Sequence, residues 1–381
     1  MDAAAFLPRR LDLAAVLAQR SCLLLGPRQT GKTSLLRHTL RPDYAYNLLE
    51  SDTYLALSRA PWRLREECLR PRSLLVIDEV QKLPDLLNEV QWLIEERGVR
   101  ALLTGSSARK LRRGGVNLLG GRARSRTLHP LVSAEMRPFD LLRALRWGGL
   151  PAVYLSDRPE EDLRSYAGDY LREEVAHEGL TRNVPAFSRF LDVAALCNGQ
   201  ILNHTQIASD AQVPRTTVHE YFSILRDTLL GYDLPAWGRA RSRKPVASSK
   251  FYLFDIGVVR QIQGRGRLEE RAADFGAALE AWIVHELRAF VDYRAEGSLH
   301  YWRTSSGFEV DFILDEAVAI KVKATRTVGE RDLKGLLAIA EETPVRRRIL
   351  VAQEARPRRI RGVEVLPVGD FLALLWAGEI H

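Results

Sequence analysis

An eight-residue segment of the chain, numbered 26–33, reads GPRQTGKT and fits the pattern GxxxxGK(S/T). Its glycines let the backbone curl so that successive N–H groups point at phosphate oxygens, while the following helix adds its positive end. Lys32 is expected to reach the β and γ phosphates, and Thr33 to bind Mg²⁺. The pattern predicts a site for ATP or ADP with Mg²⁺, formed by Gly26, Pro27, Arg28, Gln29, Thr30, Gly31, Lys32, Thr33 and Ser34.

Two acids stand at the end of an apolar segment downstream, SLLVIDE at 73–79. Asp78 is expected near the magnesium ion, and Glu79 where it can orient and deprotonate an attacking water. Two carboxylates at the end of an apolar strand are costly without a cation or water nearby. We therefore expect ATP hydrolysis, with Glu79 and Lys32 as catalytic residues and Thr33 and Asp78 as metal ligands.

Two further positions have a less specific pattern. Ser106 follows an apolar segment at 101–104, and its hydroxyl could contact the γ phosphate; a plain polar turn explains it equally well. Arg122 follows a glycine pair and could act as an arginine finger on the phosphate of a neighbouring subunit. Because this region holds several other arginines, an ordinary surface role for Arg122 stays open.

Apolar segments alternate with helical segments between residues 21 and 133, as in a parallel sheet with crossover helices. A P-loop α/β domain follows from this alternation. The expected strands are 22–25, 44–49, 74–77, 101–104 and 126–128, and the expected helices are 32–40, 64–69 and 85–96.

Several motifs occur in a fixed order and together resemble one known family. They read GPRQTGKT, DEVQKLPDLLNEVQWLIE, LLTGSSA, GGR, PLVSAE, GGLP, YFSILRDTLL, KFYLFDIG, LEAWIVHEL and GFEVDFIL. The family is that of bacterial and archaeal AAA-type (AAA+) ATPases with a C-terminal winged helix and a domain similar to PD-(D/E)xK nucleases. The resemblance implies ATP hydrolysis, assembly into a homo-oligomeric, for example hexameric, ring, and a DNA-related role. It assigns Lys32, Thr33, Asp78 and Glu79 to the nucleotide site.

The expected domains are an AAA-type P-loop ATPase domain at 1–147, a helical and winged-helix module at 148–262, and a restriction-endonuclease-like α/β domain at 263–381. In the middle module, residues 203–225 read as a helix-turn-helix whose second helix turns Arg215, Thr216 and His219 outward. A basic wing would follow at 238–250, after a helical stretch without strands. We expect its cations to meet DNA phosphates, namely Arg239, Arg241, Arg243, Lys244 and Lys250. Packing between subunits is the alternative.

The last domain lacks an acid that its resemblance predicts. Glu280 is expected on a helix and Asp311 on a strand, but the next strand has Lys321 at the acidic position and Lys323 at the lysine position. A cation at 321 would repel a metal ion and pair with Asp311 instead. No nuclease activity is expected.

The overall composition bounds the partners. The 381 residues have a net charge of +8, which suits nucleic acid but also an arginine-rich proteome, and three scattered cysteines that suggest no zinc site. No segment resembles a membrane span or a secretory signal, so a cytoplasmic protein is expected. The leading hypothesis is a ring-forming ATPase that remodels or translocates on branched DNA; the alternative is a slow ATP-gated switch or scaffold that binds protein.

Overall fold

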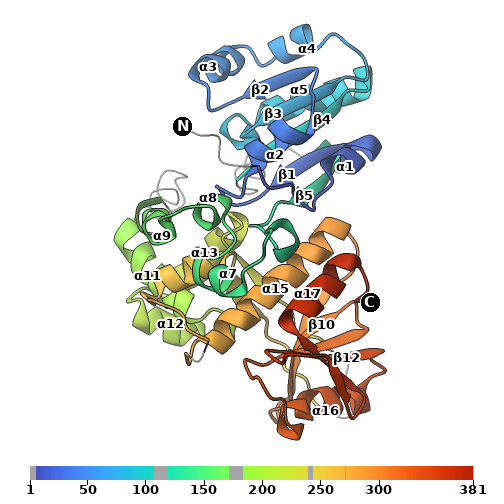
Figure 1. Cartoon of the computed structure of the whole chain (residues 1–381). Helices are drawn as coiled ribbons and strands as arrows, with labels where there is room; N and C mark the ends of the chain where they lie inside the picture. The colour runs from blue at the N-terminus through green and yellow to red at the C-terminus, as the bar shows by residue number, and fades with distance from the viewer. Residues whose placement is uncertain (1–5, 107–118, 171–182, 239–242, 271, 381) are drawn as a thin grey trace. The chain divides into compact units, whose positions relative to one another are not determined.

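The computed structural model describes residues 6–106, 119–170, 183–238, 243–270 and 272–380. The chain forms two compact units, which are considered separately (Figure 1). The first unit comprises Met1–Pro130 with Arg226–Leu230, and the second comprises Leu131–Leu225 with Gly231–His381.

The first unit contains a five-stranded parallel sheet in the order β2-β3-β4-β1-β5. The strands are β1 Ser21–Leu25, β2 Tyr44–Asn47, β3 Leu74–Asp78, β4 Arg100–Gly105 and β5 Ala123–Thr127. All five expected strands are therefore present, the last one beginning three residues earlier than predicted. Because the strands are parallel, their carboxyl ends share one edge of the sheet, and the candidate nucleotide residues follow those ends.

The helices of this unit are α1 Leu13–Gln19, α2 Lys32–Thr39, α3 Ser51–Arg59, α4 Arg63–Glu67 and α5 Leu86–Arg97. The three expected helices correspond to α2, α4 and α5, whereas α1 and α3 were not predicted. Apolar residues of α5 are buried at helical spacing, at Leu86, Val90 and Leu93, and pack with the sheet into one core. This core fixes the strands that carry the acids.

The second unit begins with helices and a small sheet. Its first elements are α7 Leu141–Trp147, α8 Pro151–Tyr154, α9 Pro159–Ser165, α11 Val184–Leu196, α12 His204–Asp210, α13 Arg215–Asp227 and α14 Ile256–Ile262. The small sheet is antiparallel in the order β6-β8-β7, with β6 Gln200–Ile201, β7 Gly231–Leu234 and β8 Lys250–Leu253. Between residues 160 and 250 we expected no strand. This was wrong, because β6 and β7, with two and four residues, are too short for alternation to reveal them.

The rest of this unit is a six-stranded mixed sheet in the order β13-β14-β12-β11-β10-β9. Its strands are β9 Leu299–Arg303, β10 Glu309–Leu314, β11 Val318–Val322, β12 Arg347–Ala352, β13 Arg358–Ile360 and β14 Val363–Pro367. They are accompanied by α15 Phe275–Arg294, α16 Lys334–Glu342 and α17 Val368–Ala377. Leu336 and Ile339 of α16 pack into a core with alternate residues of these strands.

Hydrogen bonds between distant motifs hold the second unit together. The Leu131 N–H donates to the Gly149 carbonyl over 2.6 Å, and the Gly149 N–H donates to the Asp255 carboxylate over 2.7 Å. The Ser133 N–H donates to the Glu286 carboxylate, also over 2.7 Å. Burial raises the pKa of Asp255 to about 6, although backbone donors such as Gly149 oppose the shift. Residues of the motifs PLVSAE, GGLP, KFYLFDIG and LEAWIVHEL therefore form the hydrogen bonds that connect distant parts of this unit.

Within the described ranges, no helix has both the length and the apolar character that crossing a bilayer requires.

Candidate nucleotide site and accessory sites

The phosphate-binding loop lies between β1 and α2 at the carboxyl edge of the parallel sheet. Gly31 caps α2 with φ 91°, a left-handed conformation that favours glycine. The buried Lys32 ammonium donates to the carbonyls of Gly26 and Pro27 over 2.8 and 3.1 Å. Its side chain thus lies over the loop, and reaching a phosphate would require exchanging carbonyl partners for phosphate oxygens.

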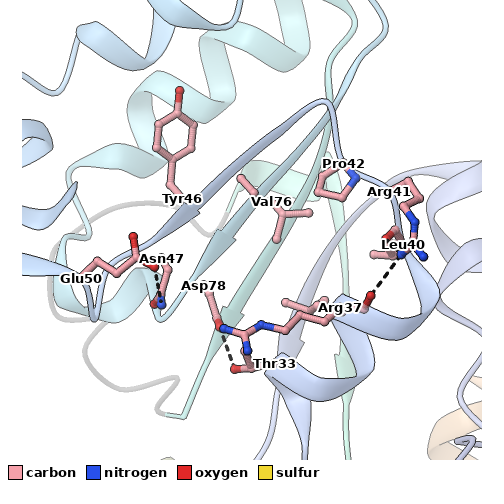
Figure 2. A pocket seen from close by; sticks show the side chains of 12 residues that line it. Thr33, Arg37, Leu40, Arg41, Pro42, Tyr46, Asn47, Glu50, Val76 and Asp78 are labelled. Atoms are coloured by element: carbon pink, nitrogen blue, oxygen red, sulfur yellow. Dashed lines mark hydrogen bonds between the residues drawn. The ribbon is translucent and has the colours of Figure 1, made fainter. Parts of the chain in front are cut away.

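A chain of hydroxyl and carboxylate groups connects the loop to the adjacent strands. The Thr33 hydroxyl donates to one oxygen of Asp78 over 2.7 Å, and the Thr104 hydroxyl donates to the other. The two side chains Thr33 and Asp78 face each other in Figure 2. Thr104 ends up beside Asp78 because β3 and β4 are neighbours in the sheet. The sequence analysis missed Thr104.

Glu79 directly follows β3 in an unusual backbone conformation. Its φ is 61°, in the left-handed region, which costs energy for a residue other than glycine. The Glu79 N–H donates to the Thr104 hydroxyl over 3.1 Å, and its carboxylate accepts from the Gln81 amide nitrogen. The same nitrogen lies 3.0 Å from the Ser106 hydroxyl. Ser106 thus shares the Gln81 amide with Glu79, while its contact with a γ phosphate stays a prediction. No sequence signal indicated Gln81.

The donor set at this corner suits Mg²⁺. Thr33 and Asp78 offer a hydroxyl and a carboxylate, and hard oxygen ligands of this kind are what Mg²⁺ prefers. No group of three or more His, Cys, Asp or Glu side chains among the described residues could hold a metal ion. Such a site fits an ion that keeps several waters and is held partly by substrate phosphates.

A cavity of about 400 Å³ opens beside the same corner (Figure 2). Thr33 and Asp78 line it, as do Asn47 and Glu50 after β2. Val76 and other apolar side chains form the part that lies between α2 and the sheet. This space is contiguous with the candidate metal ligands.

Arg9 is another residue of the site that no sequence signal indicated. Its guanidinium donates to the carbonyls of Thr30 and His129 over 2.7 and 2.6 Å. It thereby joins the loop to the segment that follows β5. Three of the predicted loop residues, Arg28, Gln29 and Ser34, are exposed.

Arg122 lies at the opposite edge of the sheet from the loop. It precedes β5, whose first residue, Ala123, pairs with Ser21 at the start of β1, whereas the loop follows the end of β1. Four residues of strand separate the two edges, about 13 Å at 3.3 Å per residue. The Arg122 guanidinium forms an ion pair with Glu95. Within one chain, Arg122 therefore does not reach the nucleotide site.

The helix-turn-helix residues have the expected exposure. Val218, Phe222 and Leu225 of α13 are buried, while Arg215, Thr216 and His219 are exposed. His219 stacks on His204 of α12, with ring centroids 4.0 Å apart.

The segment expected to form a basic wing lies between the antiparallel strands β7 and β8. On either side of residues 239–242, which lie outside the described residues, the chain pairs with the edge strand β9. The Trp237 N–H donates to the Tyr301 carbonyl over 2.7 Å and the Val246 N–H to the Arg303 carbonyl over 2.8 Å. We refer to residues 235–238 and 243–249 as the docked segment. Arg239 and Arg241 lie outside the described residues.

Two wing cations are engaged in ion pairs instead of facing solvent. Arg243 pairs with Glu341 and Glu342 of α16 over 2.6 and 2.9 Å. Lys250 is buried. Both cations thus have carboxylate partners within their own unit, and their contact with DNA phosphates stays a prediction. Lys244 is exposed and keeps its candidacy.

The nuclease-like position is occupied by a network of ion pairs. Lys321 lies 2.6 Å from Asp311, the contact that the sequence predicted. Lys250 contacts Glu280 over 3.3 Å and Glu309 over 2.8 Å. Burial alone would lower the pKa of Lys250, but these two carboxylates raise it above its ordinary value, so the ammonium stays charged. Two lysines thus lie among the three acids Glu280, Glu309 and Asp311. Lys323 follows β11 and is partly exposed.

Three domain models match successive parts of the chain. They describe an AAA domain over residues 18–137, a domain of unknown function (DUF8612) over 139–269 and a domain of unknown function (DUF4143) over 275–371. Among curated relatives, the uncharacterized proteins Mb2031c of Mycobacterium bovis and Rv2008c of Mycobacterium tuberculosis are each 28% identical over 346 residues, covering 86% of this chain and 74% of theirs.

A solved structure of the Aeropyrum pernix ORC1 protein in complex with DNA is 18% identical and covers 66% of this chain and 90% of its own. Its TM-score of 0.28 is too low to establish a shared overall fold. The AAA match coincides with the parallel sheet and the loop described above. The first unit of the chain is thus a P-loop α/β domain that is similar to AAA-type ATPase domains.

Proposed function

We propose that this protein hydrolyses ATP with Mg²⁺, that hydrolysis depends on an arginine from a neighbouring copy, and that the cycle acts on DNA. The hydrogen-bonded series Thr33, Asp78 and Thr104 beside the loop carries the first part. It brings hard oxygen ligands and a second acid, Glu79, to the edge where the loop presents its N–H groups.

Each side chain has a defined task in this proposal. Lys32 exchanges the loop carbonyls for the β and γ phosphate oxygens, and Thr33 and Asp78 hold Mg²⁺, which neutralises charge on the phosphates. Glu79 accepts a proton as the oxygen of a water attacks the γ phosphorus and the bond from that phosphorus to the bridging oxygen of ADP breaks. Ser106 lies beside Glu79 and contacts the γ phosphate.

The position of Arg122 supports a role in a neighbouring copy. It lies at the sheet edge opposite the loop, and head-to-tail packing of identical subunits brings opposite edges together in a closed ring. In such an assembly Arg122 exchanges Glu95 for the γ phosphate of the next subunit.

The exposed side of α13 supports DNA contact. Arg215, Thr216 and His219 all lie on this side, and the net charge of the chain is +8. All three side chains could contact phosphates, but only Arg215 is firmly cationic, so replacing Arg215 should reduce the salt dependence of binding by about one released counterion.

The test is ATP turnover with and without duplex and branched DNA, with Lys32→Ala as the blank. We expect magnesium-dependent turnover that Lys32→Ala abolishes and DNA stimulates at low salt, with stimulation reduced in Arg215→Ala. Loss of turnover in Lys32→Ala but no DNA binding at any salt concentration would remove the DNA part alone. Equal phosphate release by Lys32→Ala and the wild type would contradict the proposal that this site hydrolyses ATP.

A second function, an ATP-gated switch or scaffold that binds protein, is favoured by a specific observation. Two cations expected to contact DNA, Arg243 and Lys250, are engaged within the second unit. If turnover is slow and indifferent to DNA, this alternative replaces the leading one.

A further inference from the structure

Gln81 occupies a buried position between Glu79, the candidate base, and Ser106, which is expected to contact the γ phosphate. It lies in the short turn Val80–Lys82 directly after Glu79, and only 4% of it is exposed. Its amide nitrogen donates to the Glu79 carboxylate and to the Ser106 hydroxyl, the latter over 3.0 Å. One side-chain atom thus links the candidate base to the candidate phosphate sensor.

Chemistry fixes the orientation of the Gln81 amide. An ionised carboxylate can only accept hydrogen bonds, so the nitrogen of the amide, and not its oxygen, must face Glu79. The amide oxygen then points away, and it is buried without a hydrogen-bond partner in the part of the chain that the structure describes.

This unpaired oxygen argues against a purely structural role. A buried carbonyl without a partner is unfavourable, and an apolar side chain such as Met would fill the same space without that penalty. An amide at this position is therefore explained by the two hydrogen bonds that its nitrogen donates.

Gly105 provides the space for the Gln81 oxygen. A Cβ atom at position 105 would lie 2.8 Å from that oxygen, closer than van der Waals contact allows. The carbonyl of Gly105 accepts the N–H of Gly26, the first residue of the loop, over 3.2 Å. The Gln81 amide is therefore held next to a strand end that is itself bonded to the phosphate-binding loop.

We infer that Gln81 is a positioning residue for hydrolysis, which transmits contact between Ser106 and the γ phosphate to the carboxylate of Glu79. The inference rests on the proposed ATPase function. The Ser106 hydroxyl accepts one N–H of the Gln81 amide and can donate its own proton to a phosphate oxygen, which fixes the amide so that its other N–H holds the Glu79 carboxylate for the attacking water. The backbone of Glu79, held at φ 61° by Thr104, leaves the carboxylate dependent on such a side-chain contact.

The first test is Gln81→Met, which keeps the volume and removes the donor. We expect kcat to fall about tenfold or more, with KM for ATP and nucleotide affinity unchanged within about twofold, because the lost contact acts in the transition state. The control is Gln91→Met on α5, where a glutamine amide likewise donates to a glutamate, Glu95, far from the loop. It should retain wild-type kcat.

Two combinations separate transmission from packing. In Ser106→Ala, the further change Gln81→Met should lower kcat much less than it does in the wild type, because residues that act as one unit are not additive. Gly105→Ala should reproduce the kcat loss by displacing the Gln81 amide, yet have no effect in Gln81→Ala, where the obstructing atom is gone. This second arm stands even if Gln81→Met reduces the melting temperature.

The outcomes are distinguishable. Wild-type kcat in Gln81→Met, or a Gly105→Ala loss that persists in Gln81→Ala, overturns the inference while leaving the ATPase intact if Glu79→Gln remains inactive. Full turnover in Glu79→Gln overturns the proposed role of Glu79 and the inference with it. Equal factors of loss from Gln81→Met in the wild type and in Ser106→Ala would contradict transmission.

Discussion

Thr104 shows how much of this site depends on single hydroxyl groups. It is fully buried, donates to Asp78 and accepts the N–H of Glu79. One side chain therefore fixes both acids, and its other neighbours are strands of the core. Because this buried hydroxyl both donates and accepts a hydrogen bond, it constrains the positions of the two acids more strongly than their own strand does.

We predict that Thr104→Val, which keeps the shape and removes the hydroxyl, lowers kcat for ATP hydrolysis by about ten- to a hundredfold. Loss of the bond to Asp78 misplaces a magnesium ligand, and loss of the bond to the Glu79 N–H frees the strained backbone. Steady-state kinetics across magnesium concentrations would measure the effect. Thr39→Val, which removes a hydroxyl that bonds only within α2, is the control and should leave kcat unchanged. Equal effects of the two substitutions would contradict the assignment.

Glu286 predicts a pH effect on stability. It is fully buried, and burial raises its pKa to about 7, despite hydrogen bonds from Trp376 and Ser133 that oppose the shift. A carboxyl with a raised pKa binds its proton more tightly in the folded state. Its favourable contribution is therefore complete below the unfolded pKa of about 4.5 and is lost as pH rises through about 7.

We expect the free energy of unfolding of the wild type to fall relative to Glu286→Gln by up to about 3 kcal/mol between pH 4.5 and pH 8. Urea unfolding followed by tryptophan fluorescence at several pH values would measure the difference. Glu161→Gln, at an exposed helix position, is the control and should follow the wild type. Parallel curves for the wild type and Glu286→Gln would show that Glu286 does not titrate in this range.

The residues predicted from sequence and those missed differ in one physical respect. The loop from Gly26 to Thr33 is contiguous, so its chemistry can be read locally, and Asp78 and Glu79 end a strand that is recognisable alone. Thr104 and Gln81 matter only because β3 lies beside β4, and strand order is not encoded in any local pattern.

At the scale of elements, the docked segment brings its basic residue Arg243 close to carboxylates of the same unit. A loop that pairs with the edge strand β9 covers backbone groups that would otherwise be open to another strand. The sequence indicated a cationic loop, but no local pattern shows that its backbone pairs with a strand some 60 residues later. Lys250, at the start of β8, stabilises this arrangement by ion pairs with Glu280 of α15 and Glu309 of β10.

We predict that Lys250→Met destabilises the second unit by about 3 kcal/mol, because it leaves Glu280 and Glu309 without their shared cation. The triple variant Lys250→Met, Glu280→Gln, Glu309→Gln should recover most of the loss. Urea unfolding would test both. Arg63→Met, which breaks an exposed pair with Glu67, is the comparison and should cost less than about 0.5 kcal/mol. If the triple variant stays as unstable as Lys250→Met, the loss comes from packing and not from charge.

At the scale of the whole molecule, different interactions hold each of the two units together. The first is organised by one parallel sheet that brings the nucleotide groups to one edge, and this could be predicted because the alternation of strands and helices is regular. The second joins a helical part to a mixed sheet by long-range hydrogen bonds, such as that from Trp237 to Tyr301, and by ion pairs, such as that of Lys250 with Glu309. The pair of Lys321 with Asp311 could be predicted from the sequence, whereas the role of Lys250 in the same network could not.

The arrangement of the first unit leads to a prediction about assembly. The loop and Arg122 lie at opposite edges of one sheet, so a chain without Arg122 keeps an intact nucleotide site, and a chain without Lys32 keeps an intact finger. We expect Arg122→Ala and Lys32→Ala each to be inactive alone, with Arg122→Ala still binding ATP. Mixing the two should restore turnover, because some interfaces then place a wild-type arginine against a wild-type loop.

The mixture distinguishes a shared site from a self-sufficient one. Arg124→Ala is the control and should retain turnover alone, because it removes a nearby arginine of β5 whose guanidinium donates to Gln19 of α1. Activity in the mixture should rise with total protein concentration as the oligomer forms, and should vanish on dilution below its dissociation constant. An Arg122→Ala protein that hydrolyses ATP as fast as the wild type, or a mixture as inactive as its parts at every concentration, would mean that the arginine at this edge does not complete the site of a neighbouring copy.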